Sequence, residues 1–259
     1  MLNKLEQVFI HKTNRVLNVY CTAGYPLLQS TNTIINSLQK NGADIIELGI
    51  PYSDPLADGP TIQESSMQAI ENGMTIEVLF AQLEKNEGIK NNKTALILMG
   101  YLNPVLLFGF EKFCAKAKEV GVDGLILPDM PAYEFETTYK AIVDKYGLNF
   151  IFLVTPETSE ARVKMLDNLS SGFLYAVSSS SITGSDKDFN SVTAYLQRLQ
   201  SYQLKNKILV GFGIKDKQTF NLACAHSNGA IIGSAYIKAL QQSTDIETTT
   251  SQFIKQILL

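Results

Sequence analysis

Eight short apolar runs recur along the chain, and segments of helical periodicity lie between them. The runs are Val16 to Thr22, Ile45 to Gly49, Ala95 to Met99, Gly124 to Leu127, Phe150 to Val154, Phe173 to Val177, Ile208 to Gly211 and Ala230 to Gly233. The helical stretches include Thr31 to Gln39, Glu111 to Val120, Tyr133 to Asp144, Ser159 to Leu169, Val192 to Gln200 and Lys217 to Ala225. Strict alternation of strands and helices is typical of βα units around a parallel sheet. Eight strands close such a sheet, so the sequence predicts an α/β fold of the (β/α)8, or TIM barrel, type.

The length agrees with a barrel that uses the whole chain. The chain has 259 residues, and a (β/α)8 barrel typically takes about 250. We therefore expect a single TIM-barrel domain over residues 1–259, with extra helices at Leu2 to His11, at Thr61 to Asn86 after the second strand, and from Ser234 after the eighth. An open doubly wound sheet is disfavoured, because Thr22-Ala23-Gly24-Tyr25-Pro26 follows the first strand instead of a G-x-G-x-x-G turn.

Charge and composition argue against several classes of protein. Lys and Arg total 22 against 25 Asp and Glu, and no basic cluster stands out, so a nucleic-acid footprint is missing. The N-terminus lacks the apolar core of a signal peptide, and no apolar run approaches the ~20 residues of a spanning helix. We therefore expect a cytoplasmic protein without membrane binding. Cys21, Cys114 and Cys224 read as reduced core thiols, and with only two His a metal site is not expected.

The second apolar run ends in a carboxylate. Period-2 alternation puts Glu47 on the strand face opposite to Ile46 and Leu48, which in a barrel is the interior. A buried carboxylate there is costly unless it has a task or a partner. Asp58 follows in the loop after this strand, at the end of the barrel where active sites lie. Tyr101, Asn103 and Asp129 follow the third and fourth strands and should face the same rim.

The last two strands end in glycine-rich segments typical of phosphate-binding loops. Gly211 and Gly213 follow the seventh strand, and Gly233 and Ser234 follow the eighth. Glycines allow backbone N–H groups to approach an oxyanion closely, and Ser234 at a helix start adds a hydroxyl and a positive dipole end. Thr183-Gly184 after the sixth strand could close the third side. These segments indicate a phosphorylated ligand but do not specify the reaction.

The chain closely resembles the tryptophan synthase alpha subunit family over essentially its full length. The segment Glu47-Leu48-Gly49-Ile50-Pro51-Tyr52-Ser53-Asp54-Pro55-Leu56-Ala57-Asp58-Gly59-Pro60-Thr61-Ile62-Gln63 is similar to the family signature throughout. Supporting matches, in the same order as in the family, are Cys21 to Pro26, Gly121 to Gly124, Leu127 to Pro131, Tyr175, Gly211 to Ile214 and Gly233-Ser234.

This resemblance implies a carbon–carbon lyase that cleaves indole-3-glycerol phosphate to indole and glyceraldehyde 3-phosphate, with no cofactor or metal in this chain. It implies that Glu47 is the general acid and base, and that Asp58 stabilises positive charge at the indole N–H. It assigns the phosphate to Gly184, Gly211, Gly213, Gly233 and Ser234. The expected indole pocket and its supports are Tyr20, Tyr101, Leu102, Leu127, Tyr175 and Thr183.

The resemblance also implies a partner. Family members work as an alpha2-beta2 heterotetramer in which the beta subunit uses pyridoxal phosphate (PLP) to join indole to serine. Asp54 and Pro55 are the expected contacts, within a surface formed by Pro51 to Pro60 and Tyr101 to Phe108. A weak lyase activated by its partner is therefore expected.

One segment departs from the family, and several alternatives stay open at this stage. Ser179 and Ser181 stand where many relatives carry an Arg and a Gly, which affects loop closure more than the chemistry. Glu47 could be a buried ion-pair member, Asp58 an Asp-Gly turn, and the glycines ordinary strand-to-helix turns. The chain could also be another phosphate-binding barrel, such as a sugar-phosphate isomerase or epimerase, a binding subunit without activity, or a standalone indole-producing lyase.

Overall fold

A single parallel sheet forms the centre of the molecule. The structure is a computed structural model and describes residues 3–178, 186–211 and 213–259. Within these ranges the sheet has nine strands in the order β5-β4-β3-β2-β1-β9-β8-β7-β6. Their bounds are β1 Val16–Thr22, β2 Ile45–Gly49, β3 Ala95–Met99, β4 Gly124–Ile126, β5 Asn149–Phe150, β6 Leu153–Val154, β7 Phe173–Val177, β8 Lys207–Gly211 and β9 Gly229–Ile232. All the neighbouring pairs are parallel.

The two outermost strands of this order are adjacent in sequence. Only Ile151 and Phe152 separate β5 from β6. The Ile151 N–H donates to Leu125 O on β4 (3.0 Å), and Phe152 O accepts from the Tyr175 N–H on β7 (3.0 Å). The predicted strand from Phe150 to Val154 is thus divided in two, with each part paired to a different neighbour. The sheet closes on itself, and the predicted (β/α)8 barrel is confirmed.

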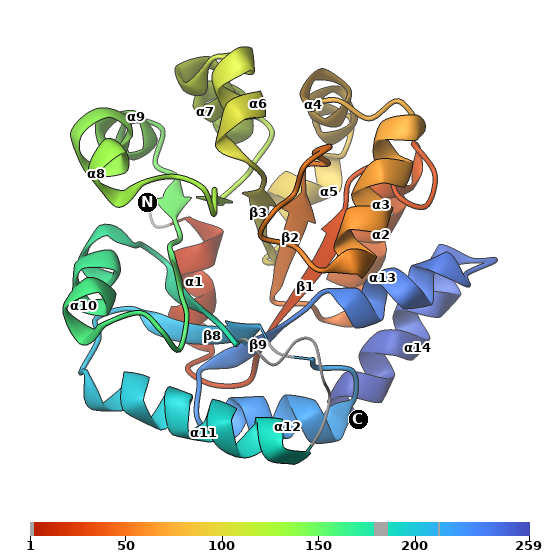
Figure 1. Cartoon of the computed structure of the whole chain (residues 1–259). Coiled ribbons are helices and arrows are strands. Elements are labelled where there is room, and N and C mark those ends of the chain that lie inside the picture. The colour runs from red at the N-terminus through yellow and green to blue at the C-terminus, as the bar shows by residue number, and fades with distance from the viewer. Residues whose placement is uncertain (1–2, 179–185, 212) are drawn as a thin grey trace.

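Helices surround the sheet (Figure 1). Their bounds are α1 Lys4–His11, α2 Ser30–Asn41, α3 Pro60–Glu71, α4 Ile76–Glu84, α5 Glu87–Asn91, α6 Leu102–Phe108, α7 Phe110–Glu119, α8 Ala132–Glu134, α9 Lys140–Lys145, α10 Glu160–Leu169, α11 Asp186–Ser201, α12 Lys217–Ala225, α13 Ser234–Gln241 and α14 Ile246–Leu258. A π-helical stretch, η1 Phe135–Tyr139, joins α8 to α9. Helices therefore occupy all the predicted helical stretches, including the extra ones after the second and eighth strands.

Three helices, α5, α6 and α14, were not expected from the pattern. α5 has five residues and α6 has seven, so neither spans enough turns to show a clear apolar period. α14 contains the β-branched run Thr248 to Thr250, which has low helix propensity. Its buried residues Phe253, Ile254 and Ile257 nevertheless form one apolar face, and the helix packs against α2. Tertiary packing decides the structure of this segment.

The sheet is buried on both faces near the site that the sequence predicts. Every residue of β1, β2 and β3 is buried, because side chains fill the barrel and helices cover its outside. Most of these residues are aliphatic. Asn18 and Glu47 are exceptions, and both are 0% exposed. The fold therefore holds two adjacent polar side chains in an apolar environment.

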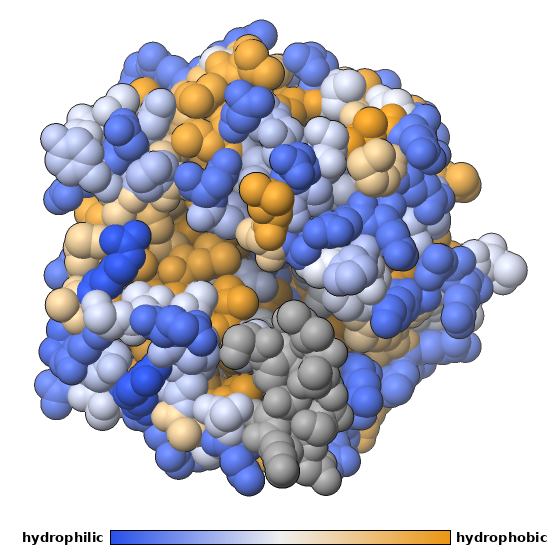
Figure 2. Space-filling view, viewed as in Figure 1, coloured by the Kyte–Doolittle hydropathy of each residue, from blue (hydrophilic) through white to orange (hydrophobic). Residues whose placement is uncertain are grey.

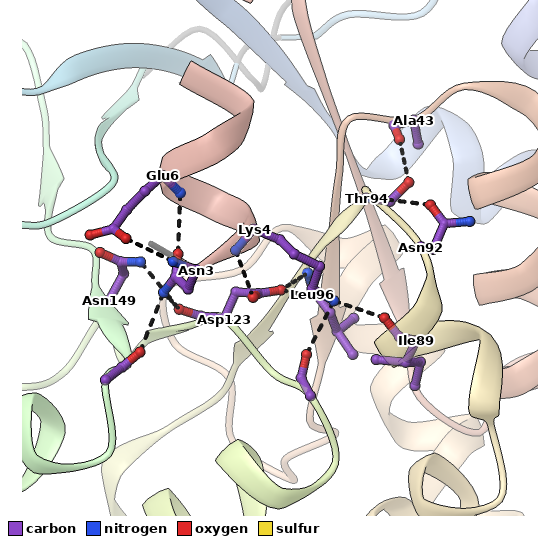
Figure 3. Close-up of polar contacts among 12 residues, drawn as sticks. Asn3, Lys4, Glu6, Ala43, Ile89, Asn92, Thr94, Leu96, Asp123 and Asn149 are labelled. Atoms are coloured by element: carbon purple, nitrogen blue, oxygen red, sulfur yellow. Dashed lines mark hydrogen bonds and ion pairs between the residues drawn. The ribbon is translucent and has the colours of Figure 1, made fainter. Parts of the chain in front are cut away.

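Helix α1 is held at the N-terminal ends of the strands by the polar contacts that Figure 3 shows. Asn3 forms a capping box with Glu6 and donates through Nδ2 to Asp123 O (2.9 Å). Lys4 Nζ donates to Ile89 O (2.8 Å) and forms an ion pair with Asp123 Oδ2 (3.2 Å). Asp123 also accepts from the Leu96 N–H (3.0 Å). These partners lie at or beside the N-terminal ends of β3 and β4, so the network fastens α1 to the base of the barrel.

Removal of the Asp123 carboxylate tests the contribution of this network. The variant Asp123→Ala removes the countercharge of the Lys4 ammonium and the acceptor of the buried Leu96 N–H, so the free energy of unfolding is expected to fall by about 3 kcal/mol. Urea denaturation of the full chain measures the change. The control Asp144→Ala breaks an exposed ion pair with Lys140 and is expected to change stability little. Equal losses in the two variants would contradict a specific role of Asp123.

Candidate active site

A cavity of about 480 Å³ lies at the C-terminal ends of the strands. Eight residues singled out in the sequence line it: Tyr20, Glu47, Asp58, Tyr175, Gly211, Gly213, Gly233 and Ser234. Further lining residues include Ile62, Met99, Val177, Ile214, Lys215, Ile231 and Lys238. The two carboxylates predicted to do chemistry and the glycine-rich segments of β8 and β9 therefore share one cavity.

Glu47 is held inside the barrel by a single amide. Asn18 on β1 donates through Nδ2 to Glu47 Oε2 at 2.8 Å, and within the described residues Oε1 has no hydrogen-bond partner. Burial raises the pKa of Glu47 to about 8, the Asn18 hydrogen bond lowers it, and the charge of Asp58 raises it. In the described part of the chain no Lys or Arg pairs with Glu47, so the ion-pair alternative finds no support.

This environment suits a group that both gives and takes a proton. A carboxyl with a pKa near 8 carries its proton at neutral pH and loses it at little free-energy cost. An ordinary carboxyl would already be ionised and could act only as a base. Glu47 can therefore serve as a general acid in one step and a general base in the next.

Asp58 reaches the cavity from the loop between β2 and α3. The Tyr101 hydroxyl donates to Asp58 Oδ2 (2.9 Å) and accepts from the Ala57 N–H (2.9 Å). The Tyr101 ring also stacks on Tyr52, with centroids 5.1 Å apart. The Asp58 N–H donates to Pro55 O (3.0 Å), so Asp58 does end a turn, but its side chain also lines the cavity. Burial raises the pKa of Asp58 and the Tyr101 hydrogen bond opposes that rise.

The opposite part of the cavity offers backbone donors and two cations. Gly211 ends β8, Gly213 has a φ of +29°, and Gly233 is the N-cap of α13. The first N–H groups of a helix lack partners within the helix, so the start of α13 is suited to an anion. Lys215 and Lys238 also line the cavity and were missed. The sequence does contain a signal for both, because Lys215 follows the Gly-rich segment after β8 and Lys238 lies one helical turn after Ser234.

Two tyrosine side chains pack against glycines on neighbouring strands. A Cβ added to Gly49 would lie 2.1 Å from the Tyr20 hydroxyl, and one added to Gly211 would lie 2.8 Å from the Tyr175 hydroxyl. Any side chain at either glycine would displace a tyrosine that lines the cavity. Burial raises the pKa of both tyrosines, so they are neutral at physiological pH. Among the described contacts, no hydrogen bond joins Tyr175 to Glu47.

Other predicted pocket residues lie outside the cavity lining or outside the described residues. Leu127 is buried beyond β4, and Leu102 begins α6, where its N–H donates to Asp129 Oδ1 (2.9 Å). Tyr101 contributes its contact with Asp58 and is not among the lining residues. Thr183 and Gly184, together with Ser179 and Ser181, lie outside the described residues.

An apolar surface borders the cavity on the side predicted to meet a partner. Leu56 is 84% exposed in the loop that carries Asp58, and Leu107 on α6 is 81% exposed. Figure 2 shows apolar side chains gathered over α6 and α7. A groove of about 280 Å³ lies beside them, lined in part by Pro51, Pro104 and Leu107. Asp54 is exposed, whereas Pro55 is buried.

The described ranges lack the features of a metal site and of a membrane-spanning helix. Residues 3–178, 186–211 and 213–259 contain no group of three or more His, Cys, Asp or Glu placed to hold a metal ion. None of the helices in these ranges is both long and apolar enough to cross a membrane.

The chain is similar to one family of known proteins. A family model described as tryptophan synthase alpha chain matches residues 8–257. The tryptophan synthase alpha chain of Flavobacterium johnsoniae is 50% identical over 243 residues, which are 93% of this chain and 95% of that protein. The one from Christiangramia forsetii is 47% identical over 258 residues, 99% of this chain and 98% of that protein.

Solved structures agree in fold. The crystal structure of tryptophan synthase subunit alpha from Legionella pneumophila has a TM-score of 0.89 at 29% identity, covering 99% of this chain and 97% of that chain. A chain of the tryptophan synthase complex from Pyrococcus furiosus has a TM-score of 0.83 at 31% identity, covering 95% and 99%. The likeness thus extends over the barrel and both ends of the cavity.

Proposed function

The chain belongs to the tryptophan synthase alpha chain family, and from this premise we propose that Glu47 and Asp58 carry out the family's reaction in the cavity described above. The enzyme is a carbon–carbon lyase of tryptophan biosynthesis, and it cleaves indole-3-glycerol phosphate to indole and glyceraldehyde 3-phosphate. The observation that carries the assignment of residues is Glu47, a buried acid with a pKa near 8 in a cavity that also contains Asp58.

Glu47 handles both protons of the cleavage. It first donates its proton to C3 of the indole ring, which removes the aromaticity of the five-membered ring and places positive charge on N1. Glu47 then takes the proton from the hydroxyl on the adjoining side-chain carbon. As the aldehyde forms, the carbon–carbon bond breaks and its electron pair returns to the ring, which restores indole. Glu47 ends protonated as it began, and no redox change occurs.

Asp58 stabilises the cationic intermediate. Its carboxylate accepts a hydrogen bond from the indole N1–H, where the positive charge develops after protonation at C3. The hydrogen bond from Tyr101 supports this role, because it holds the carboxylate of Asp58 toward the cavity and favours its ionised form. Two carboxylates with different partners can therefore take different roles, one proton-carrying and one charged.

The phosphate binds at the glycine-rich end. Backbone N–H groups of Gly211, Gly213 and Gly233, with the Ser234 hydroxyl and the start of α13, form the proposed cradle, and we assign Gly184 to its third side. The indole ring is assigned to the part of the cavity bordered by Tyr20 and Tyr175. Leu102, Leu127 and Thr183 remain proposed supports of this pocket. The full chain, residues 1–259, acts as one domain.

The partner is a beta subunit. Members of this family function with a beta subunit, and we propose an alpha2-beta2 heterotetramer in which the partner holds PLP and this chain holds no cofactor. The exposed Asp54, Leu56 and Leu107 form the proposed contact surface, with Pro55 buried in the same loop beneath it. Indole is apolar, so direct transfer to the partner prevents its loss through membranes. A cytoplasmic location fits the three free, buried cysteines, which suit a reducing compartment.

Indole release from indole-3-glycerol phosphate tests this proposal. The purified wild-type chain is expected to form indole slowly and to form it faster when a tryptophan synthase beta subunit is added. Formation of glyceraldehyde 3-phosphate in equal amount would establish the carbon–carbon cleavage. Activation of the partner without cleavage by this chain would instead favour a binding subunit. Absence of indole from both mixtures would favour a different phosphate-binding barrel.

A further inference from the structure

Asn18 is a buried polar residue in the middle of an apolar strand. On β1 it is in register with Ile45 of β2 and Ile231 of β9, and its side chain is fully buried. Burial of an amide in such surroundings costs free energy unless its polar atoms are paired. Its Nδ2 donates to Glu47 Oε2 at 2.8 Å, while its Oδ1 has no partner within the described residues. Burial of the Asn18 amide therefore costs folding free energy, and the polar group that it contacts in return is the Glu47 carboxyl.

We propose that Asn18 is a positioning residue that holds the Glu47 carboxyl in place and leaves Oε1 as the oxygen that exchanges protons with the substrate. The proposal rests on the proposed role of Glu47. Because the Asn18 amide donates to Oε2, that oxygen is occupied in the role of acceptor. Oε1 has no partner among the described residues, so it is the oxygen left to carry the acidic proton.

An amide fits this position better than a charged or an apolar side chain. A Lys would keep Glu47 ionised and prevent it from starting as an acid. A Leu would leave the carboxyl without any donor and hold it too firmly in the neutral form. A single neutral N–H donor stabilises the ionised form modestly, so both protonation states stay within reach. Asn18 therefore suits a residue that must act as an acid and then as a base.

The other groups around Glu47 do not stabilise its ionised form. Tyr20 and Cys21 on β1 and Tyr175 on β7 interact electrostatically with Glu47, and burial keeps all three neutral at physiological pH. Asp58, from the loop after β2, is the charged neighbour, and it raises the pKa of Glu47. Among the described residues, the Asn18 hydrogen bond is the influence that lowers it.

The variant Asn18→Leu tests the proposal through the pH dependence of kcat/KM for indole-3-glycerol phosphate. In the wild type, kcat/KM should fall on the alkaline side as Glu47 loses its proton. Without the donor, ionisation of Glu47 becomes harder, so this limb should move upward by about one pH unit. The lost positioning should lower kcat about tenfold with little change in KM. The change removes the unpartnered Oδ1 but also leaves Glu47 Oε2 without a donor, so these opposing effects should leave a small net change in thermal stability.

A control variant and a direct titration separate this role from a structural one. Thr94→Val removes a buried hydrogen bond to Ala43 O (3.0 Å) next to the start of β3, at the opposite end of the barrel, and should leave the alkaline limb in place. Carbon-13 carboxyl NMR, with Glu47→Gln identifying the signal, follows Glu47 without any assay. A higher titration midpoint in Asn18→Leu supports the proposal, and an unchanged midpoint overturns it. An inactive wild type would count against the proposed function alone, because the titration still decides the role of Asn18.

Discussion

Replacement of Glu47 by Gln is expected to lower kcat for indole formation by about 10⁴-fold, because one side chain supplies both the acid and the base of the reaction. Gln has nearly the same shape and can still accept the hydrogen bond from Asn18, so the fold should be retained. Steady-state assays with and without the beta subunit measure the loss. The matched control Glu71→Gln changes an exposed acid on α3 and should retain wild-type activity. A Glu47→Gln enzyme within tenfold of the wild type would remove Glu47 from the mechanism.

The same variant carries an expected change in stability with pH. The folded-state pKa of Glu47, about 8, is above the ordinary value of 4.5, so the folded protein binds the proton more tightly than the unfolded chain. Stability contributed by this proton is present below pH 4.5 and is lost as pH rises through 8. Gln cannot ionise and escapes this loss. Glu47→Gln should therefore gain stability relative to the wild type between pH 5 and pH 8, as thermal denaturation across this range can measure.

Asp58→Asn is expected to lower kcat by about 10³-fold with a smaller effect on KM, because the cationic intermediate loses its countercharge. The Asn side-chain oxygen can still accept from Tyr101, so the loop should keep its anchor. Kinetics of the isolated chain and of the complex measure the effect. Asp144→Asn, an exposed change on α9, is the control for loss of an acid. A raised KM with an unchanged kcat would assign Asp58 to substrate binding instead of catalysis.

Local patterns predicted the barrel well because each βα unit is short and regular. Period-2 alternation located β2 and placed Glu47 inside, and the glycines after β8 and β9 marked the other end of the cavity. The strand from Phe150 to Val154 was expected to be continuous, and its division into β5 and β6 follows from pairing with two different neighbours. Strand pairing is a long-range property that no local window contains.

The missed parts of the site depend on contacts between distant segments. Asn18 reads as a lone polar interruption of an apolar strand, and only its approach to Glu47 gives it meaning. Tyr101 was expected in the pocket wall, but its hydroxyl holds Asp58 and Ala57 of a loop that lies more than 40 positions earlier. Both roles depend on distances across the barrel mouth, which the sequence does not encode in any spacing.

The fastening of α1 has a consequence for synthesis of the protein. This helix precedes all the strands in the sequence, yet side chains of Lys4 and its N-cap Asn3 contact backbone and carboxylate groups at Ile89, Gly121, Asp123 and Gly147. These contacts join residues that lie between 85 and 144 positions apart in the sequence. During synthesis α1 can therefore dock fully only after the segments that lead into β3, β4 and β5 have been made.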